Sequence, residues 1–354
     1  MASRIKVAVL GATGLVGQRF IQILSKHPWF EVAYLAASER SVGRKYRDVT
    51  KWIVENNLPE DIGEMVVERI DADKIKEEGI EIVFSALPSN VALDIEVELA
   101  KKGLLVFSNA SPLRLEKDVP LINGEVNPEH LGVVETQRRV RGWGGVIVKN
   151  PNCSTAILTL AVKPLLDEFG LRRIIVTTMQ AVSGAGLRGV ASIEIIDNII
   201  PFIEKEEWKI ENETRKILGR LVDGFIEPLD VNVYATTTRV PVVDGHLEVV
   251  YLETSRSIDV EQAINTLEEF RGVPQDMKLP TAPEKPIIVR REVDRPQPRL
   301  DRLAGGGMSV VVGRIEAKER NMLRMVVLGH NTIRGAAGAA VLAAELYCKF
   351  YGLV

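Results

Sequence analysis

Apolar and polar residues follow two different rhythms along the chain. In the first part, short apolar runs at 5–10, 31–36, 81–87 and 104–110 are separated by helical patterns, for example at 15–26. A second helical pattern covers about 90–102. Strands that alternate with helices and end in small polar residues are typical of a doubly wound parallel sheet, with ligands bound at the carboxyl ends of the strands. The pattern therefore predicts an α/β domain.

The rhythm changes after residue 150. Segments at 172–180, 231–240, 246–253 and 308–328 are rich in β-forming residues, and tight-turn pairs such as Asp244-Gly245 separate them. This pattern predicts an α+β domain with a mixed, largely antiparallel sheet. The last segment is rich in small residues with helical spacing and suits close packing, so we expect it to return to the first domain. We predict a first domain of 1–149 completed by a C-terminal helix at 331–354, and a second domain of 150–330.

Length and charge narrow the class of protein. The chain has 354 residues, 46% hydrophobic and 26% charged, which suits two globular domains. A net charge of -3 gives no electrostatic reason to expect nucleic acid or an acidic membrane as a partner. No apolar run approaches the roughly 18 residues that span a bilayer. A strand pattern begins soon after Met1 and leaves no room for a signal peptide, so we expect a cytoplasmic protein without a metal site.

The two cysteines lie in dissimilar surroundings and form no disulfide framework. Asn150 reads as a helix N-cap and Pro151 as the first helical residue, which places Cys153 in the first turn of a helix that stops at Gly170. Unpaired N–H groups and the helix dipole favour a thiolate there, so we expect a pKa below the free value of about 8.5 and a nucleophile. The alternative is a small buried side chain, and this is how we interpret Cys348.

Three glycines follow the first predicted strand. Gly11, Gly14 and Gly17 lie between that strand and a helix, where backbone N–H groups can approach a pyrophosphate. The alternative is a glycine-rich turn that binds no ligand. The context of strand and helix favours a dinucleotide site.

The end of the second strand bears on the choice of cofactor. An NAD site would place Asp or Glu there for the ribose 2′-hydroxyl, whereas this chain has Ser38, Glu39, Arg40 and Ser41. Arg40 between hydroxyl groups suits a 2′-phosphate and favours NADP. If Glu39 points inward instead, NAD becomes the better choice.

Four histidines could act beside the cysteine. His27 and His130 lie in segments that resemble surface loops, whereas His246 opens a strand after a tight turn and can be aimed at a cleft. Arg239, seven residues earlier, could anchor a carboxylate. Taken alone, the two residues are better explained as a turn histidine and a surface arginine.

The motifs in combination resemble the aspartate-semialdehyde dehydrogenase family, in its archaeal and fungal branch. The resemblance extends over nearly the whole chain. It rests on Gly-Ala-Thr-Gly-Leu-Val-Gly at 11–17, Ser38-x-Arg40-Ser41-x-Gly43, Ser-Asn-Ala-Ser at 108–111, Asn-Pro-Asn-Cys-Ser at 150–154, Gln-Ala-Val-Ser-Gly-Ala-Gly at 180–186, Glu-Thr-Arg-Lys at 213–216 and Asn-x-x-Arg-Gly-Ala-Ala-Gly at 331–338.

The resemblance implies a role for individual residues. Cys153 would be the nucleophile, Gln180 would orient the acyl group and His246 would be the acid/base. Arg239 would hold the α-carboxylate and Glu213 the amino group of the substrate. The phosphate would be bound by Arg114 and Lys216 with Asn109 beside them, although Pro112 and Asn123-Gly124 depart from the usual pattern near Arg114. The residues implied for cofactor binding are Gly11, Thr13, Gly14, Leu15, Val16, Ser38, Arg40, Ser41, Ser85, Leu87, Ser183, Gly184 and Asn331.

The implied fold is a Rossmann-like domain joined to a catalytic and dimerisation domain, in a homodimer or homotetramer. The implied reaction is the NADPH-dependent reductive dephosphorylation of L-aspartyl 4-phosphate to L-aspartate 4-semialdehyde, a step in lysine, methionine and threonine biosynthesis. Cys153 would form a thioester, and hydride from the cofactor would reduce it. The alternatives are a malonyl-CoA or succinyl-CoA reductase on the same scaffold and a catalytically silent nucleotide-sensing protein.

Overall fold

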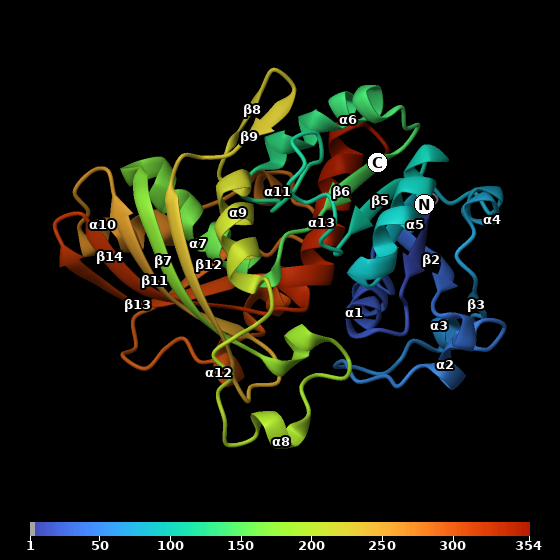
Figure 1. Cartoon of the computed structure of the whole chain (residues 1–354), viewed down its shortest axis with the longest axis horizontal. Helices are drawn as coiled ribbons and strands as arrows, with labels where there is room; N and C mark the ends of the chain where they lie inside the picture. Colours follow the sequence, from blue (N-terminus) through green and yellow to red (C-terminus); the bar gives the residue numbers. More distant parts are fainter. Residues whose placement is uncertain (1–3) are drawn as a thin grey trace.

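The computed structural model describes residues 4–354, so residues 1–3 of the predicted first domain lie outside the described residues. Two six-stranded sheets lie in opposite halves of the molecule (Figure 1). One is built from the first part of the chain and the other from the second. Within residues 4–354, no helix is both long and apolar enough to cross a membrane.

The first sheet is parallel throughout and has the strand order β3-β2-β1-β4-β5-β6. Its central strands are buried apolar runs, as expected for a parallel sheet covered on both faces. The strands are β1 (Ile5–Leu10), β2 (Phe30–Ala36), β3 (Val67–Glu68), β4 (Ile82–Ser85), β5 (Leu105–Ser108) and β6 (Val146–Lys149). The carboxyl ends of β4, β5 and β6 lie in register and present Ser85, Ser108 and Lys149 at one edge.

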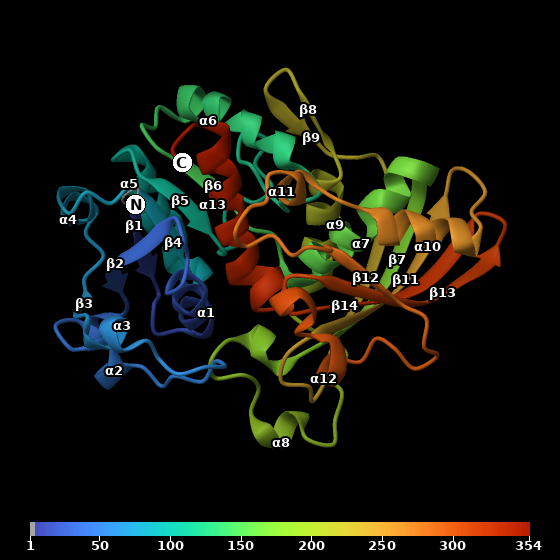
Figure 2. The same cartoon turned by 180° about the vertical axis from the view of Figure 1, so that it is seen from behind.

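Helices cover this sheet as predicted for a doubly wound fold. The segments between strands contain α1 (Leu15–Leu24), α2 (Tyr46–Val49), α3 (Glu60–Glu64), α4 (Ala72–Glu77), α5 (Ser89–Lys101) and α6 (Val134–Arg141). The C-terminal helix α13 (Gly338–Phe350) packs against β5 and α1 (Figure 2), which places the end of the chain on the first sheet. A short π-helical turn at 333–337 precedes α13 and contacts both α1 and the helix that begins at Cys153.

The second sheet is mixed, as the sequence predicts, with the order β10-β7-β11-β14-β13-β12. The pairs β7/β11, β11/β14 and β13/β14 are antiparallel, whereas β10/β7 and β12/β13 are parallel. The strands are β7 (Leu171–Gln180), β10 (Asn232–Arg239), β11 (His246–Thr254), β12 (Ile287–Arg290), β13 (Val310–Glu319) and β14 (Met322–Gly329).

Helices and a hairpin complete this part of the molecule. The long helix α7 and the helix α10 contact the sheet, and α9 lies against β10. The helices are α7 (Cys153–Phe169), α8 (Ser192–Ile195), α9 (Glu206–Ile217), α10 (Val260–Glu269), α11 (Val273–Asp276) and α12 (Pro298–Asp301), and the hairpin consists of β8 (Arg220–Val222) and β9 (Phe225–Glu227).

Two local predictions are wrong. Helix α7 begins at Cys153, and its N-cap is Asn152, whose side chain accepts from Ser154 N–H (3.0 Å) and Thr155 N–H (3.2 Å). Asn150 therefore lies outside the helix. His27 and His130 are buried rather than in surface loops. His27 Nε2 lies 2.7 Å from Glu345 and His130 Nδ1 lies 2.9 Å from the Asn127 amide, so these imidazoles hold the core together.

Candidate active site

A cavity of about 450 Å³ opens where the two sheets meet, at the first turn of α7. Both parts of the chain contribute to its wall. The first part supplies Val16, Ser89, Asn109, Ser111 and Arg114, and the second supplies Cys153, Ser183, Gly184, Glu206, Lys209, Arg239 and Asn331. A thiol therefore shares one concave surface with several charged side chains, which is a common arrangement in active sites.

Cys153 and His246 lie in direct contact in this structure. Cys153 Sγ is 3.1 Å from His246 Nε2, and His246 Nδ1 accepts a hydrogen bond from Ala181 N–H at 3.0 Å. Since Nδ1 is the acceptor, the proton of the neutral imidazole lies on Nε2 and points at the sulfur. Burial lowers the pKa of His246 well below 6.5, and Arg239 acts in the same direction. His246 is therefore held as a neutral hydrogen-bond donor.

The predicted lowering of the Cys153 pKa is wrong. Burial of the thiol, and then the negative charge of Glu206, raise its pKa to about 12. Arg239, the Ser154 N–H and Arg114 oppose this rise without cancelling it. The helix start thus supplies only part of the electrostatic environment, because the side chains that close the cavity also desolvate the sulfur.

Two glycines permit the close packing around the thiol. A Cβ on Gly335 would lie 2.7 Å from Cys153 Cβ, and a Cβ on Gly184 would lie 2.6 Å from an Arg239 nitrogen. Neither position has room for a methyl group. The small-residue segment before α13 can therefore lie directly on the first turn of α7.

Arg239 and Arg114 are the two buried guanidinium groups of the cavity wall. Arg239 lies at the end of β10, and its NH1 donates to Ala181 O at 2.7 Å. Arg114 donates to Asn109 O at 2.6 Å and pairs with Glu213 at 2.9 Å. Each is 7% exposed, so a bound anion would meet little competition from water.

Glu213 and Lys216 are not in the cavity wall, but Glu213 contacts Arg114 and Asn152, which are, so the expected contact of both residues with substrate stays a prediction. Glu213 is engaged by Arg114 and by Asn152 N–H at 2.6 Å. Lys216 Nζ donates to the carbonyls of Arg114, Glu116 and Val119, each at 2.6 Å. Burial lowers its pKa to about 7. In this structure the two side chains hold the loop that carries Arg114.

Glu206 and Lys209 are the acid and the lysine of α9 that line the cavity wall. Glu206 is 6% exposed and accepts from Asn152 Nδ2 at 2.6 Å, and its second oxygen lies 3.4 Å from Lys209 Nζ. The sequence carries the same Glu-x-x-Lys spacing twice, seven residues apart. Two helical turns separate the copies, so both lie on one face of α9 and only their distance from Cys153 distinguishes them.

Other predicted residues surround this core. Ser183, Gly184 and Asn331 line the cavity, and Asn331 bonds Ser183 Oγ (2.8 Å) and Gly245 N–H (2.8 Å). Asn109 lines it as well. Gln180 is 1% exposed and its amide lies 3.3 Å from Thr178 Oγ1, so in this structure its side chain is outside the wall.

A second cavity, of about 620 Å³, lies at the carboxyl edge of the first sheet. Gly11, Thr13, Gly14, Ser38 and Leu87 line it, as a dinucleotide site requires. A Cβ on Gly11 would lie 2.6 Å from the Ala86 carbonyl, and its φ of +75° favours glycine.

The remaining cofactor residues lie elsewhere. Leu15, Arg40, Ser41 and Ser85 are not part of either cavity wall, and Val16 lines the cavity of the thiol. Ser85 is fully buried and donates to Glu96. Arg40 is exposed, and Glu39 lines the second cavity while lying 3.4 Å from Arg69. Leu15 and Ser85 therefore support the binding loops through packing and hydrogen bonds.

The two cavities adjoin each other at the starts of α1 and α5. Gly14 and Pro88 line the second cavity, whereas Val16 and Ser89 line the cavity of the thiol. A dinucleotide can therefore lie along the sheet edge with one end in each cavity. The helix N-termini between them suit a pyrophosphate.

Two family models cover most of the chain. The model described as semialdehyde dehydrogenase, NAD binding domain, matches residues 6–133. The model described as semialdehyde dehydrogenase, dimerisation domain, matches residues 162–334 and supports a homo-oligomer.

Individual relatives match over almost their full length. An aspartate-semialdehyde dehydrogenase of Methanothermobacter thermautotrophicus is 52% identical over 344 residues, which are 97% of this chain and 98% of the relative. A malonyl CoA reductase (NADP) of Metallosphaera sedula is 40% identical over 350 residues, or 98% and 97% of the two chains. The crystal structure of aspartate semialdehyde dehydrogenase with NADP from Candida albicans is 43% identical, with a TM-score of 0.90 over 99% of this chain and 100% of that one. The chain therefore belongs to the aspartate-semialdehyde dehydrogenase family, in the branch with archaeal and fungal members.

Proposed function

We propose that the protein catalyses the NADPH-dependent reductive dephosphorylation of L-aspartyl 4-phosphate to L-aspartate 4-semialdehyde, in the biosynthesis of lysine, methionine and threonine. The observation that carries this function is the contact of Cys153 with His246 in a cavity that Arg114, Arg239, Glu206 and Lys209 line. The nucleotide groove of the first sheet adjoins this cavity.

Cys153 supplies the nucleophile. The Cys153 thiol passes its proton to the departing phosphate, and the thiolate, which Arg239 and Arg114 favour, forms the S–C bond as the bond from the acyl carbon to the phosphate oxygen breaks, which gives a thioester. The Nε2–H of His246 donates a hydrogen bond first to the sulfur and then to the oxyanion that develops on the acyl oxygen, as a neutral imidazole can in other enzymes. When bound, the cofactor supplies the hydride that reduces the thioester.

The charges of the cavity wall match the substrate. Arg239 suits the α-carboxylate, because its guanidinium is buried beside the thiol. We assign the amino group to Glu206, and the phosphate to Arg114 together with Lys209. Glu213 and Lys216 remain the alternatives for the amino group and the phosphate, because Glu213 contacts Arg114 and Asn152 of the same wall. Asn109 and Gln180 stay predicted as neighbours of the phosphate and the acyl group.

Glu39 lines the groove of the first sheet and Arg40 does not, which taken alone favours NAD; we assign NADP because the Candida albicans relative was solved with NADP. Gly11, Thr13 and Gly14 approach the pyrophosphate, and Ser38 lies where the adenosine ribose is expected. Arg40 follows Ser38 on an exposed turn and can fold over a 2′-phosphate. Leu87 lies in the same groove, while Val16, Ser183, Gly184 and Asn331 surround the nicotinamide end in the cavity of the thiol.

A malonyl-CoA or succinyl-CoA reductase is the second candidate, favoured by the 40% identical relative from Metallosphaera sedula. Such a substrate needs the thiol, but it has no amino group at the acyl chain for Glu206 and no phosphate on the reacting carbon for Lys209. The buried acid in the cavity wall therefore favours the amino-acid substrate.

The second sheet supports a dimer. The side of the sheet away from α7 exposes Ile175 on β7 (39%) and Tyr234 on β10 (54%). The loop before α9 exposes Ile199 (60%) and Phe202 (65%), and α9 itself exposes Trp208 (57%). Exposed apolar groups at this density are typical of a protein interface. We propose a homodimer, or a homotetramer of such dimers, in the reducing cytoplasm that a free catalytic thiol needs.

One steady-state assay tests the substrate. Aspartate semialdehyde should be oxidised with NADP only when phosphate or arsenate is present, and Cys153→Ala should abolish turnover while NADP binding persists. Cys153→Ser should fail as well, because a hydroxyl is not ionised near neutral pH. Efficient reduction of malonyl-CoA or succinyl-CoA without any need for phosphate would favour the second candidate.

A further inference from the structure

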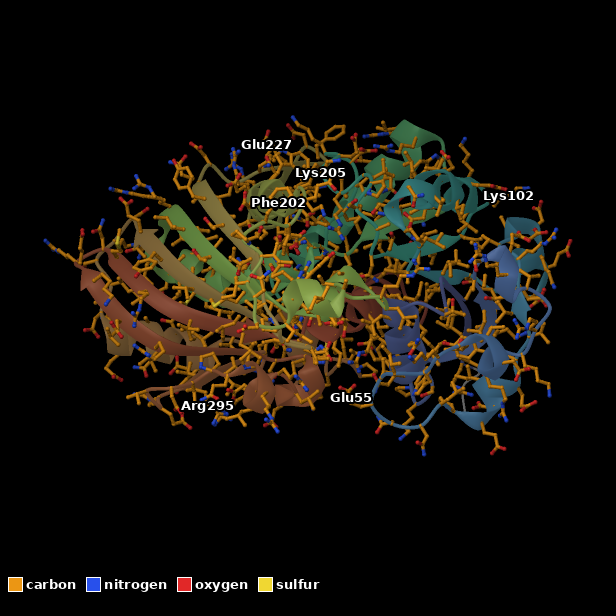
Figure 3. The ribbon with its side chains drawn as sticks, turned by 60° about the horizontal axis from the view of Figure 1, so that its bottom comes forward. Glu55, Lys102, Phe202, Lys205, Glu227 and Arg295 are labelled. Carbon is orange, nitrogen blue, oxygen red and sulfur yellow. The ribbon has the colours of Figure 1, made fainter. Side chains whose placement is uncertain are left out.

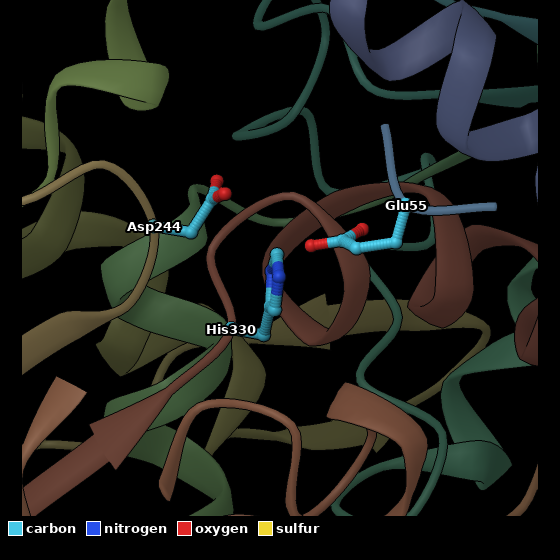
Figure 4. A group of neighbouring side chains, drawn as sticks. All are labelled: Glu55, Asp244 and His330. Atoms are coloured by element: carbon cyan, nitrogen blue, oxygen red, sulfur yellow. The ribbon is translucent and has the colours of Figure 1, made fainter. Parts of the chain in front are cut away.

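Glu55, Asp244 and His330 meet at the boundary between the two halves of the molecule (Figure 4). Glu55 follows α2, Asp244 lies between β10 and β11, and His330 follows β14. One donor atom from each lies within 4.8 Å of the others. The three residues are far apart in the sequence, which therefore gives no sign of this cluster.

Two members of the cluster are buried and have unused acceptor or donor atoms. His330 is fully buried and Asp244 is 8% exposed. Among residues 4–354, neither His330 Nε2 nor Asp244 Oδ1 has a hydrogen-bond partner. In Figure 4 the imidazole of His330 extends between the two carboxylates. Buried polar atoms without partners cost free energy, so their presence in one small space indicates a ligand.

Two arginines lie beside the cluster and limit what it can bind. Arg19 pairs with Glu55, and its NH2 is 3.7 Å from Asp244 Oδ2. Arg302 donates to the Asp244 carbonyl at 3.3 Å. Arg19 also bonds Thr332 Oγ1 and Gln22 Oε1, each at 3.0 Å. It therefore keeps two partners when Glu55 turns away, so a cation can take the carboxylate without leaving Arg19 unpaired.

We propose that Glu55, Asp244 and His330 form a site for a divalent transition-metal ion such as Zn²⁺, held between the two halves of the molecule. An imidazole with two carboxylates is a common donor set for such ions. Metal bonds of about 2.1 Å at tetrahedral angles place donor atoms about 3.4 Å apart. The cluster must therefore contract by up to about 1.4 Å, and the exposed side chain of Glu55 can make that movement by giving up its ion pair with Arg19.

The position of the site predicts its effect. Asp244 precedes Gly245 and His246, and His330 precedes Asn331, which bonds Gly245 N–H. Glu55 belongs to the other half of the molecule and lies at its edge in Figure 3. A bound ion would therefore fix the segment of His246 against the nucleotide-binding half and raise the thermal midpoint of the protein.

The test measures Zn²⁺ binding by equilibrium dialysis, with full-length protein whose Cys153 has been alkylated. Alkylation removes the other plausible zinc ligand, the thiol beside His246. The variants are Glu55→Gln, whose amide oxygen can still accept from Arg19, and His330→Gln; Glu60→Gln, an exposed acid in α3, is the matched control. Co²⁺ serves as a second probe, because its visible spectrum reports nitrogen and oxygen ligands without a thiolate band.

We expect one Zn²⁺ per chain in the wild type and in Glu60→Gln, with an affinity about 10- to 100-fold weaker in Glu55→Gln. The rise in thermal midpoint on adding Zn²⁺ should disappear in Glu55→Gln and persist in the control. The proposal is overturned if the alkylated wild type binds no Zn²⁺ stoichiometrically, or if Glu55→Gln and Glu60→Gln bind it equally well. Since this test needs no turnover, its failure would leave the proposed function untouched.

Discussion

His246 can be tested by comparing glutamine and alanine at its position. Its Nδ1 accepts from Ala181 N–H, so its Nε2–H faces Cys153 Sγ 3.1 Å away. If the ring gained a second proton, Nδ1–H would point at Ala181 N–H and the hydrogen bond between them would be lost. If the residue acts as a donor, glutamine, which can place an N–H group near the position of Nε2, should replace it in part, whereas alanine should not.

The size of the effect follows from the loss of one donor to the oxyanion. Loss of such a donor costs about 10²–10³ in kcat, or about 2.7–4 kcal/mol. We expect His246→Ala to lower kcat/KM by this factor and His246→Gln to recover at least about tenfold of it.

The assay is steady-state oxidation of aspartate semialdehyde with NADP and phosphate between pH 6 and 9. Because burial lowers the pKa of His246 well below 6.5, the imidazole stays neutral over this range, and it would lose the Ala181 bond only at more acidic pH. The wild-type profile should therefore lack an inflection near pH 6.5. Equal losses in both variants, or an inflection near 6.5 that vanishes in His246→Gln, would refute the donor role and restore an acid/base role.

Four further outcomes follow from the same geometry. The rate of Cys153 alkylation by iodoacetamide should rise about tenfold per pH unit from 7 to 9, since the thiol pKa is about 12; a plateau at pH 8 would contradict this. Lys209→Ala should raise the KM for phosphate about 10- to 100-fold, whereas Lys216→Ala should mainly lower the urea midpoint of unfolding, and the reverse result would restore the original assignment. Arg40→Ala should raise the Kd of NADPH, measured by fluorescence titration, far more than that of NADH; equal changes would make it a surface residue. Arg334→Met should cost about 3–5 kcal/mol in chemical denaturation, because it leaves buried Glu125 unpaired; a loss below 1 kcal/mol would show that the pair is dispensable.

The fold could be predicted from the sequence because its signals are local. Gly11 and Gly14 follow a buried strand, and β10, β11 and β14 alternate buried and exposed residues, so the period of the pattern reveals both kinds of sheet. The division of the chain at residue 150 stays a prediction. Local signals also sufficed for the placement of Cys153 in a first helical turn.

Sequence patterns are least informative where side chains from different segments meet in space. Glu206 and Glu213 lie two helical turns apart on one face of α9, and nothing in the helical pattern tells which of them reaches the thiol. The Cys153 pKa depends on groups from three other segments, so a rule for helix N-termini gives the wrong direction. His27 looks like a loop residue because its buried partner, Glu345, lies 318 residues away in the sequence.

The contact of Gly335 with Cys153 has a consequence for biosynthesis. The ribosome makes Cys153 well before residues 331–350. Those later residues complete both the wall of the cavity and the packing on the first sheet. The thiol therefore stays open to water, oxidants and electrophiles while the second sheet is being synthesised. A released chain that ends at residue 330 contains every strand of the second sheet but should be catalytically silent, and a separately supplied peptide of residues 331–354 should restore activity.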